Sequence, residues 1–236
     1  MSRKKSNERI FCFGCPHTPY NHKDLIRFIK AIKKKYKPTR AVCLGDERDK
    51  HAQNMHDHHP DLDSAGPERI ASMKVLKEIE KLFPYLDLID SNHGSLHLRQ
   101  AVKSGTPSAY YKALQDVYNV KGWRWYPKLI LTLPNGNRCL FKHELGSNIK
   151  LEAQKKGMCV VQSHFHTLFE ARYSNNTENK YWGATIGCLI DDDSLAFVYN
   201  KNNKEAPILG AMMIVNSKPI LIPMDLDAKG RWDGKL

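Results

Sequence analysis

The chain has 236 residues, of which 41% are hydrophobic and 26% are charged. It is therefore too apolar for a disordered protein and long enough for one large or two small domains. Its 37 Lys and Arg residues against 25 Asp and Glu give a formal net charge of +12, which favours an anionic partner such as nucleic acid. No apolar run approaches the roughly 20 residues that a transmembrane helix needs, and the basic N-terminus lacks the features of a signal peptide. We expect a cytoplasmic protein with no membrane partner.

Apolar runs rich in β-branched residues or cysteine predict buried strands, and helical periodicity between them predicts helices. The strands are expected at Arg9–Phe13, Arg40–Leu44, Leu86–Asp90, Lys128–Leu133, Cys139–Lys142 and Cys159–Gln162. The helices are expected at 22–36, 67–83 and 108–118. After Arg172 the pattern predicts strands alone, at 181–190, 194–199, 208–215 and 218–224. The cysteines lie in these apolar runs, so we expect free thiols.

The order of these elements indicates a fold class. Strands and helices alternate at first, and a β-rich portion follows from about residue 173. The sequence contains no long linker or internal repeat, so we expect residues 1–236 to form a single domain. An α/β body closed by C-terminal strands is typical of a layered mixed sheet or sandwich with helices outside.

Five of the predicted strands end in a small cluster of His, Asp, Asn or Cys. The clusters are GCPH at 14–17, GDERD at 45–49, DSNHG at 90–94, KHE at 142–144 and QSHFH at 162–166. Each cluster alone is compatible with an ordinary polar turn. Ligand sites in α/β folds, however, lie at the C-terminal ends of strands, so the five clusters together predict one shared site.

In order and internal spacing, these clusters resemble the signature of the calcineurin-like metallophosphoesterases, which runs D-x-H, G-D-x-x-D, G-N-H-(D/E), H and G-H-x-H. The corresponding segments are C-P-H at 15–17, G-D-E-R-D at 45–49, S-N-H-G at 91–94, His143 and S-H-F-H at 163–166. The resemblance covers about residues 11–167. It implies a four-layer α/β/β/α sandwich of mixed sheets flanked by helices, two divalent metal ions and hydrolysis of phosphoesters. The compact chain also resembles phage-encoded members, which would work in the host cytoplasm.

The resemblance also implies roles for individual residues. A phosphoester resists attack because its oxygens repel an incoming nucleophile, and a pair of cations neutralises that charge. Asp46 matches the ligand that bridges the two metals. The other implied ligands are Cys15, His17 and His166 for the first metal, and Asn92, His143 and His164 for the second.

Two further residues match catalytic positions of the family. His93 corresponds to a histidine that is not a ligand, contacts the scissile phosphate and protonates the leaving oxygen. Asp49 would orient His93 and hold it protonated, because a neighbouring carboxylate raises the pKa of an imidazole.

The sequence departs from the family signature at several positions. Cys15 replaces an aspartate, and a thiolate shifts metal preference from Mg²⁺ and Mn²⁺ toward Zn²⁺ or Fe²⁺. The expected ions are Mn²⁺, Zn²⁺ or Fe²⁺ rather than Mg²⁺. Alternatively, Cys15 is not a ligand, and the first metal is bound more weakly. Gly94 replaces an acid outside the ligand set. Serines at 91 and 163 replace glycines, which we interpret as minor changes because a small polar residue fits many tight turns.

Two other segments each have two interpretations, and a third has one. The His-rich segment 51–63 is either a loop that gathers metal or phosphate, or a solvated polar loop. The KGWRWYPK segment at 121–128 either stacks nucleic-acid bases or forms a half-buried edge strand. Lysines at 30, 33, 34, 35 and 37 complement a helix C-terminus and are expected in solvent.

The sequence thus favours a metal-dependent phosphoesterase that acts on phosphodiesters, with DNA or RNA as the partner of the basic surface. Within the enzyme class, a small-molecule phosphatase or a cyclic-nucleotide phosphodiesterase is the alternative. From another class, the chain could be a nucleic-acid-binding protein with a degenerate metal site. The oligomeric state is not given by the sequence.

Overall fold

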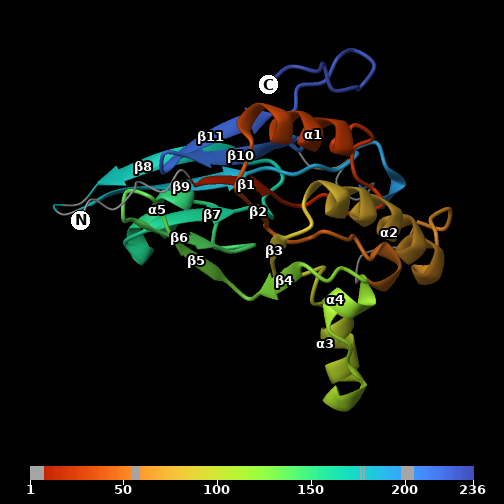
Figure 1. Ribbon diagram of the computed structural model, residues 1–236. Coiled ribbons are helices and arrows are strands. Elements are labelled where there is room, and N and C mark those ends of the chain that lie inside the picture. Colours follow the sequence, from red (N-terminus) through yellow and green to blue (C-terminus); the bar gives the residue numbers. More distant parts are fainter. Residues whose placement is uncertain (1–7, 55–58, 176, 178, 198–204) are drawn as a thin grey trace.

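The computed structural model describes residues 8–54, 59–175, 177, 179–197 and 205–236. Its strands form two sheets (Figure 1). The first sheet has the order β11-β10-β1-β2-β3-β4. Its strands are β1 (Arg9–Phe13), β2 (Arg40–Cys43), β3 (Leu86–Ile89), β4 (Trp123–Tyr126), β10 (Gly210–Val215) and β11 (Lys218–Pro223). Strands β1 to β4 are parallel, whereas β10 runs antiparallel to β1.

The second sheet has the order β5-β6-β7-β9-β8. Its strands are β5 (Leu129–Thr132), β6 (Arg138–Phe141), β7 (Cys159–Gln162), β8 (Phe169–Asn175) and β9 (Lys180–Ile186). Strands β6, β7 and β9 are parallel, and the two edge strands pair in antiparallel fashion. In each sheet, the loops that follow the parallel strands therefore lie along one edge.

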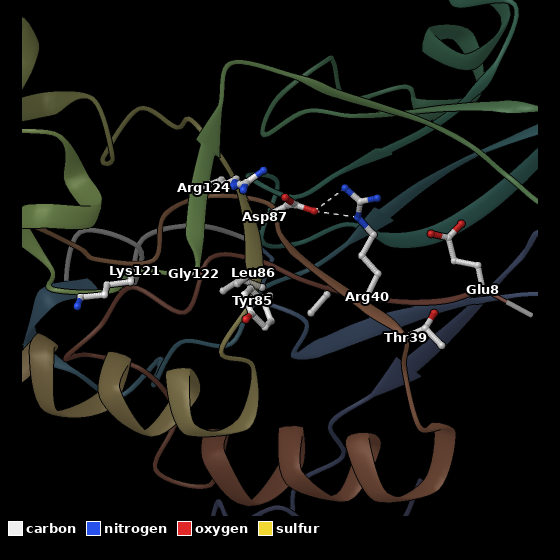
Figure 2. A pocket seen from close by; sticks show the side chains of 10 residues that line it. Glu8, Thr39, Arg40, Tyr85, Leu86, Asp87, Lys121, Gly122 and Arg124 are labelled. Atoms are coloured by element: carbon white, nitrogen blue, oxygen red, sulfur yellow. Dashed lines mark hydrogen bonds and ion pairs between the residues drawn. The ribbon is translucent and has the colours of Figure 1, made fainter.

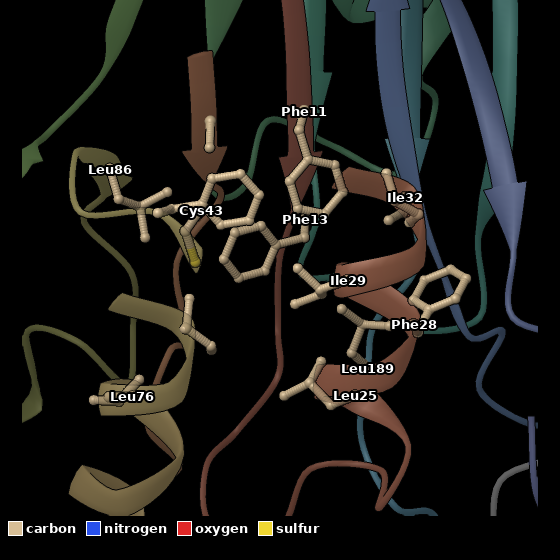
Figure 3. Close-up of a cluster of buried hydrophobic side chains, with 14 of the residues drawn as sticks. Phe11, Phe13, Leu25, Phe28, Ile29, Ile32, Cys43, Leu76, Leu86 and Leu189 are labelled. Carbon is tan, nitrogen blue, oxygen red and sulfur yellow. The ribbon is translucent and has the colours of Figure 1, made fainter. Parts of the chain in front are cut away.

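Alternate residues of the central strand β1 belong to different layers, as the period of a strand requires. Phe11 and Phe13 pack with α1 (Leu25–Tyr36) and α2 (Ala65–Leu82) on the outer face of the first sheet (Figure 3). Ile10 and Cys12 belong to the cluster that includes residues of the second sheet. Helix α5 (Ile149–Lys156) packs on the second sheet through β7, β8 and β9. The four-layer arrangement of helix, sheet, sheet and helix predicted from the sequence is confirmed.

The helix α1 shows why this layer forms. Its apolar residues at 25, 28, 29 and 32 follow helical spacing, and all four are buried. Lysines 33, 34 and 35 occupy its last turn, where they complement the helix dipole as expected. Lys37 ends the helix in the left-handed conformation with φ of 47°.

Several predicted elements differ in the structure. The single helix expected at 108–118 is wrong: a 3-10 turn at Ser108–Tyr110 is followed by the short helix α4 (Leu114–Val117). The strand expected at 194–199 is also wrong where it can be followed, because residues 195–197 form a 3-10 turn, and 198–199 lie outside the described residues. The helices α3 (Leu96–Lys103) and α5 and the 3-10 helix His51–Gln53 were not predicted. Among the described residues, no helix is both long and apolar enough to cross a membrane.

Candidate metal centre

All five polar clusters follow the C-terminal end of a strand, as predicted. Three of them follow β1, β2 and β3 of the first sheet, and two follow β6 and β7 of the second. The clusters meet where the two sheets face each other. His143 of the second sheet, for example, lies 3.1 Å from Asp46 of the first through its Nε2 atom and a carboxylate oxygen.

The backbone around the site is held in unusual conformations. Cys15, His17, Asp46 and His164 have positive φ angles of 48°, 46°, 50° and 65°. Such conformations cost of order 1–3 kcal/mol each for residues with a side chain, and they cluster at functional sites. Gly45 precedes Asp46 with a φ of 92°, and a Cβ there would lie 2.6 Å from the Cβ of Ser91. Only glycine fits at this position.

Four atoms with lone pairs converge around His143. Its Nδ1 lies 2.7 Å from the backbone oxygen of Leu44 and must donate there, because a carbonyl oxygen only accepts. In the neutral ring Nε2 then carries no proton. It nevertheless lies 2.8 Å from Oδ1 of Asn92, 3.1 Å from Oδ2 of Asp46 and 3.2 Å from Nδ1 of His164. A cation placed among these atoms would relieve their mutual repulsion.

His17 repeats this arrangement on the other side of Asp46. Its Nδ1 donates to Oδ1 of Asp49 over 2.7 Å, and the two side chains are both 2% exposed. Its Nε2 is buried, has no hydrogen-bond partner in the described part of the chain and lies 3.5 Å from Oδ2 of Asp46. Histidine ligands of metals characteristically donate their other ring N–H to a carboxylate or a backbone carbonyl. Both His17 and His143 meet this description.

Cys15 lies within the same site and is fully buried. Its Sγ accepts a hydrogen bond of 3.3 Å from the backbone N–H of His164 and lies 3.1 Å from Oγ of Ser163. The sulfur forms one potential metal-binding group with His17 and His166, and another with Asp46 and His143. Burial, followed by Asp46, raises the pKa of the Cys15 thiol. A thiolate at this position therefore needs a cation beside it.

The electrostatics of the cluster are dominated by the buried carboxylate of Asp46. Burial alone would raise its pKa, but His143 and His17 hold the pKa well below the usual value. Burial likewise would lower the pKa of His143, and Asp46 raises it above the usual value. The pKa of His166 is lowered by burial and by His17, and that of His164 by burial and by His143. His164 and His166 therefore present neutral rings, the form that binds metals.

The carboxylate of Asp49 lies closer to His17 than to His93, the partner expected from the sequence. It accepts from His17, and its nearest approach to Nδ1 of His93 is 3.7 Å. His93 instead hydrogen-bonds through Nδ1 to the backbone oxygen of Asp49, and its own backbone N–H donates to Oδ1 of Asp46 over 3.2 Å. The pKa of His93 is lowered, chiefly by burial, rather than raised. Asp49 thus holds His93 through its main chain and His17 through its side chain.

The structure brings together every residue predicted for the site. It also shows which groups the side chains of Ser91 and Ser163 contact. The Oγ of Ser91 accepts from the backbone N–H groups of Asp46 and Gly94, both over 2.9 Å. The hydroxyl of Ser163 donates to the backbone oxygen of Gly187 over 2.8 Å, beside the sulfur of Cys15. Their positions within the motifs were the only available signal.

The structure also decides between the interpretations of other segments. KGWRWYPK contains β4, so the edge-strand interpretation is confirmed. Trp123 is buried and its indole N–H donates to the backbone oxygen of Phe83, which leaves no free ring face for a base. In the His-rich segment, residues 56–58 lie outside the described residues, while His51 is buried and lies 3.8 Å from a carboxylate oxygen of Asp49.

A large cavity of about 460 Å³ lies far from this chemistry, at the opposite ends of β2, β3 and β4 (Figure 2). Its main polar feature is the ion pair between Arg40 and Asp87, in which a guanidinium nitrogen lies 2.7 Å from the carboxylate. Arg40 begins β2, whereas the metal-centre residues follow the end of that strand. The cavity is therefore separate from the candidate site.

No protein-family model matches the sequence, and no curated protein matches it. Among solved structures, Vps29 from Chaetomium thermophilum is similar, with a TM-score of 0.51 and 14% identity over 94% of this chain and 91% of that chain. Vacuolar Protein Sorting 29 from Cryptosporidium parvum has a TM-score of 0.50 and 12% identity over 97% and 93%. YfcE, a phosphoesterase from E. coli, has a TM-score of 0.47 and 11% identity over 88% of both chains.

The two Vps29 structures have the calcineurin-like metallophosphoesterase fold. Their similarity extends over nearly the whole of this chain, so it shows that the chain has this fold. The fold implied by the five sequence clusters is confirmed. At these identities the comparison shows the fold alone, and the chemistry must be argued from the residues of the site.

Proposed function

We propose that the protein is a metal-dependent phosphoesterase with a dinuclear metal centre, and that its substrates are phosphodiesters of nucleic acids. The observation that supports this most directly is the pair of imidazole Nε2 atoms on either side of Asp46, each of which carries no proton when its ring is neutral. Nε2 of His17 and Nε2 of His143 lie 3.5 Å and 3.1 Å from the same carboxylate oxygen. A carboxylate that lies between two sets of nitrogen donors is suited to act as a ligand that bridges two metal ions.

The donor set fits two divalent cations. One ion would be held by Cys15, His17 and His166. The other ion would be held by Asn92, His143 and His164. Asp46 would bind both ions. A sulfur and several imidazoles favour Zn²⁺, Fe²⁺ or Mn²⁺ over Mg²⁺. When bound, the ions would neutralise phosphate oxygens and lower the pKa of water.

His93 is placed to exchange a proton with the substrate. Its Nδ1 is held by the backbone oxygen of Asp49, which leaves Nε2 as the exchangeable position. Burial lowers the pKa of the ring in the absence of substrate, but a bound phosphate is negatively charged and raises it. His93 would then donate a proton to the leaving oxygen.

The choice of nucleic acid as substrate is supported by charge. A formal net charge of +12 attracts polyanions over long range. We also place the protein in the cytoplasm, since all six cysteines are buried free thiols.

Hydrolysis of bis-p-nitrophenyl phosphate, compared with that of the monoester, tests the proposal. Protein stripped by a chelator should be inactive and should recover when Mn²⁺ or Zn²⁺ is added. Asp46→Asn should abolish both metal content and turnover. Asp87→Asn is the matched control, because Asp87 pairs with Arg40 at the other end of the sheet. A protein that binds no metal and hydrolyses neither ester under any metal would refute the proposal.

A further inference from the structure

A second cavity lies directly beside the candidate metal centre and is lined by basic groups. It has a volume of about 310 Å³, and we call it the basic pocket. Arg48 and Lys50 enter it from the loop after β2, Arg69 from α2 and His97 from α3. Tyr118, just after α4, forms part of its apolar side.

Two of these cations are buried and form no direct ion pair with the described residues. The exposed fractions of Arg48 and Lys50 are 6% and 2%. Among the described residues, none places a carboxylate oxygen within 4.0 Å of either charged group. Among the same residues, the buried Nε of Arg48 has no hydrogen-bond partner. A buried donor without a partner is costly, so this N–H indicates a position for an anion in the pocket.

Two buried acids, Glu47 and Glu68, act on Lys50 from beyond ion-pair distance, and Oε2 of Glu47 and Oε1 of Glu68 have no hydrogen-bond partner among the described residues. A carboxylate oxygen of Glu47 lies 3.3 Å from the hydroxyl of Tyr118, which donates to it. The carboxylate of Glu68 accepts from the backbone N–H of Ala52 over 3.1 Å. Neither residue lines the pocket.

Hydrogen-bond donors remain available to such an anion. The ammonium of Lys50 donates to the backbone oxygen of Gly94 over 2.6 Å and to Nδ1 of His97 over 3.1 Å, which leaves its third N–H. Because an ammonium can only donate, Nδ1 of His97 accepts, and the ring proton sits on Nε2. The pocket thus gains a further donor from a neutral histidine, whose pKa is lowered to about 4 by burial and by Lys50.

The N-terminus of α2 contributes a favourable dipole. Ala65 and Gly66, the first residues of this 18-residue helix, line the pocket. The side chain of Ser64 does not cap the helix, and the space beside the α-carbon of Gly66 is open. The first N–H groups of a helix bind phosphate and other anions. This feature is independent of the buried cations and points to the same kind of ligand.

The basic pocket adjoins the reacting groups. Arg48 and Lys50 flank Asp49, and the ammonium of Lys50 holds the backbone oxygen of Gly94, the residue after His93. We propose that the basic pocket binds a second phosphate of the substrate, adjacent in the chain to the scissile one, while Leu114 and Val117 contact the attached sugar or base. This rests on the proposed function and narrows its substrate class to phosphodiesters that carry a neighbouring terminal phosphate.

A pair of thymidine dinucleotides, pTpT with a 5′-phosphate and TpT without it, tests this proposal. Binding is measured by calorimetry on metal-free Asp46→Asn protein at 150 mM salt, so that no hydrolysis is needed. We expect pTpT to bind roughly tenfold more tightly than TpT, the order of effect for one charge-assisted contact. Arg69→Ala and Lys50→Met should each remove most of this preference. Lys74→Ala is the matched control, because Lys74 is exposed on the same helix and does not line the pocket.

The outcomes separate the two proposals. Equal binding of pTpT and TpT, or an equal loss of preference in Lys74→Ala, would overturn the assignment of the basic pocket. A preference that depends on Arg69 and Lys50 supports the assignment, even if the wild-type protein with metal hydrolyses neither dinucleotide and the enzymatic proposal fails. Hydrolysis of both dinucleotides at the same kcat/KM by wild-type protein would leave the phosphoesterase proposal standing and would contradict the pocket.

Discussion

Replacing Asp49 by Asn tests which histidine its carboxylate serves. The carboxylate accepts from Nδ1 of His17 over 2.7 Å, and both side chains are 2% exposed. A buried hydrogen bond to a charged group contributes about 1.5–3 kcal/mol. The bond fixes the His17 ring so that Nε2 faces Asp46. Asn can still accept this bond but lacks the charge, so we expect a loss of about 1.4–2.7 kcal/mol, which is a 10- to 100-fold weaker affinity for one metal ion.

The assay is a competition titration with a chromophoric chelator, using Zn²⁺ and Mn²⁺ and resolving the two binding steps. Only the step that involves His17 should weaken, while the step that involves His143 stays within twofold. Asp87→Asn serves as the control, and thermal melting verifies that each variant is folded. If both metal affinities are unchanged and turnover alone falls, the carboxylate serves His93, and the reasoning from the hydrogen bond to His17 is refuted.

Further predictions address other features. Cys15→Ser should lower the ion content of purified protein, measured by elemental analysis, because a neutral hydroxyl replaces a thiolate ligand; two ions retained per chain would contradict this. His93→Ala should lower kcat roughly 10²- to 10⁴-fold with metal content unchanged, whereas loss of metal would make His93 a ligand. Gly45→Ala should lower the free energy of unfolding by about 2–4 kcal/mol in urea denaturation, well beyond the matched Gly136→Ala, which shares a φ near 91° but has nothing within 4 Å of the added Cβ. Because burial lowers the pKa of Lys50 to about 8, its ammonium loses its proton as the pH rises from 7 to 9, and the preference for pTpT in kcat/KM should fall; a preference that stays constant would argue against a role for this charge. The groups that act on Lys50 are Glu47, Arg48, Asp46, Glu68 and His97.

The location of the metal centre could be predicted because it depends on local patterns. A buried strand that ends in polar residues, such as β2 with Gly45 and Asp46 after it, is visible in a short stretch of sequence. Parallel pairing then brings such ends together without further information. The two sheets supply one set of clusters each, and the resemblance to a known signature gave their roles.

The helix α5 shows what the pattern could not predict. Only Ile149 and Ala153 of this helix are buried, so its apolar periodicity is weak, and Leu151 is 43% exposed. Its capping signals were present: the side chain of Asn148 accepts from the backbone N–H of Leu151, and Gly157 ends the helix in the left-handed conformation. The strand predicted at 194–199 was wrong for a different reason, because residues 195–197 form a turn. There Phe197 packs its ring at 5.6 Å from that of His17, a tertiary contact that overrides the strand-like alternation.

The hydrogen-bond partners within the site could not be predicted from the sequence either. His17 and His93 follow different strands, and their rings lie 4.7 Å apart, so both are within reach of the loop that holds Asp49. Which of them receives the carboxylate depends on how the left-handed residues His17 and Asp46 aim their side chains. A spacing of residues along the chain does not encode that choice.

The charges of the site and the basic pocket act in the same direction. In the proposed ligand set only Asp46 and the thiolate of Cys15 are negative, so two divalent ions would leave the centre positively charged. Asp49 does not reduce this charge as a ligand, because its carboxylate is committed to His17. A thiolate at Cys15 carries the same charge as the aspartate of the family signature, but sulfur is a softer donor than oxygen. The difference therefore alters the metal preference of the site more than its affinity for phosphate. Arg48 and Lys50, which form no ion pair within 4.0 Å among the described residues, extend the positive charge past His93 and offer hydrogen-bond donors to a second phosphate. The distribution of charge therefore favours a substrate with two phosphates over one with a single phosphate.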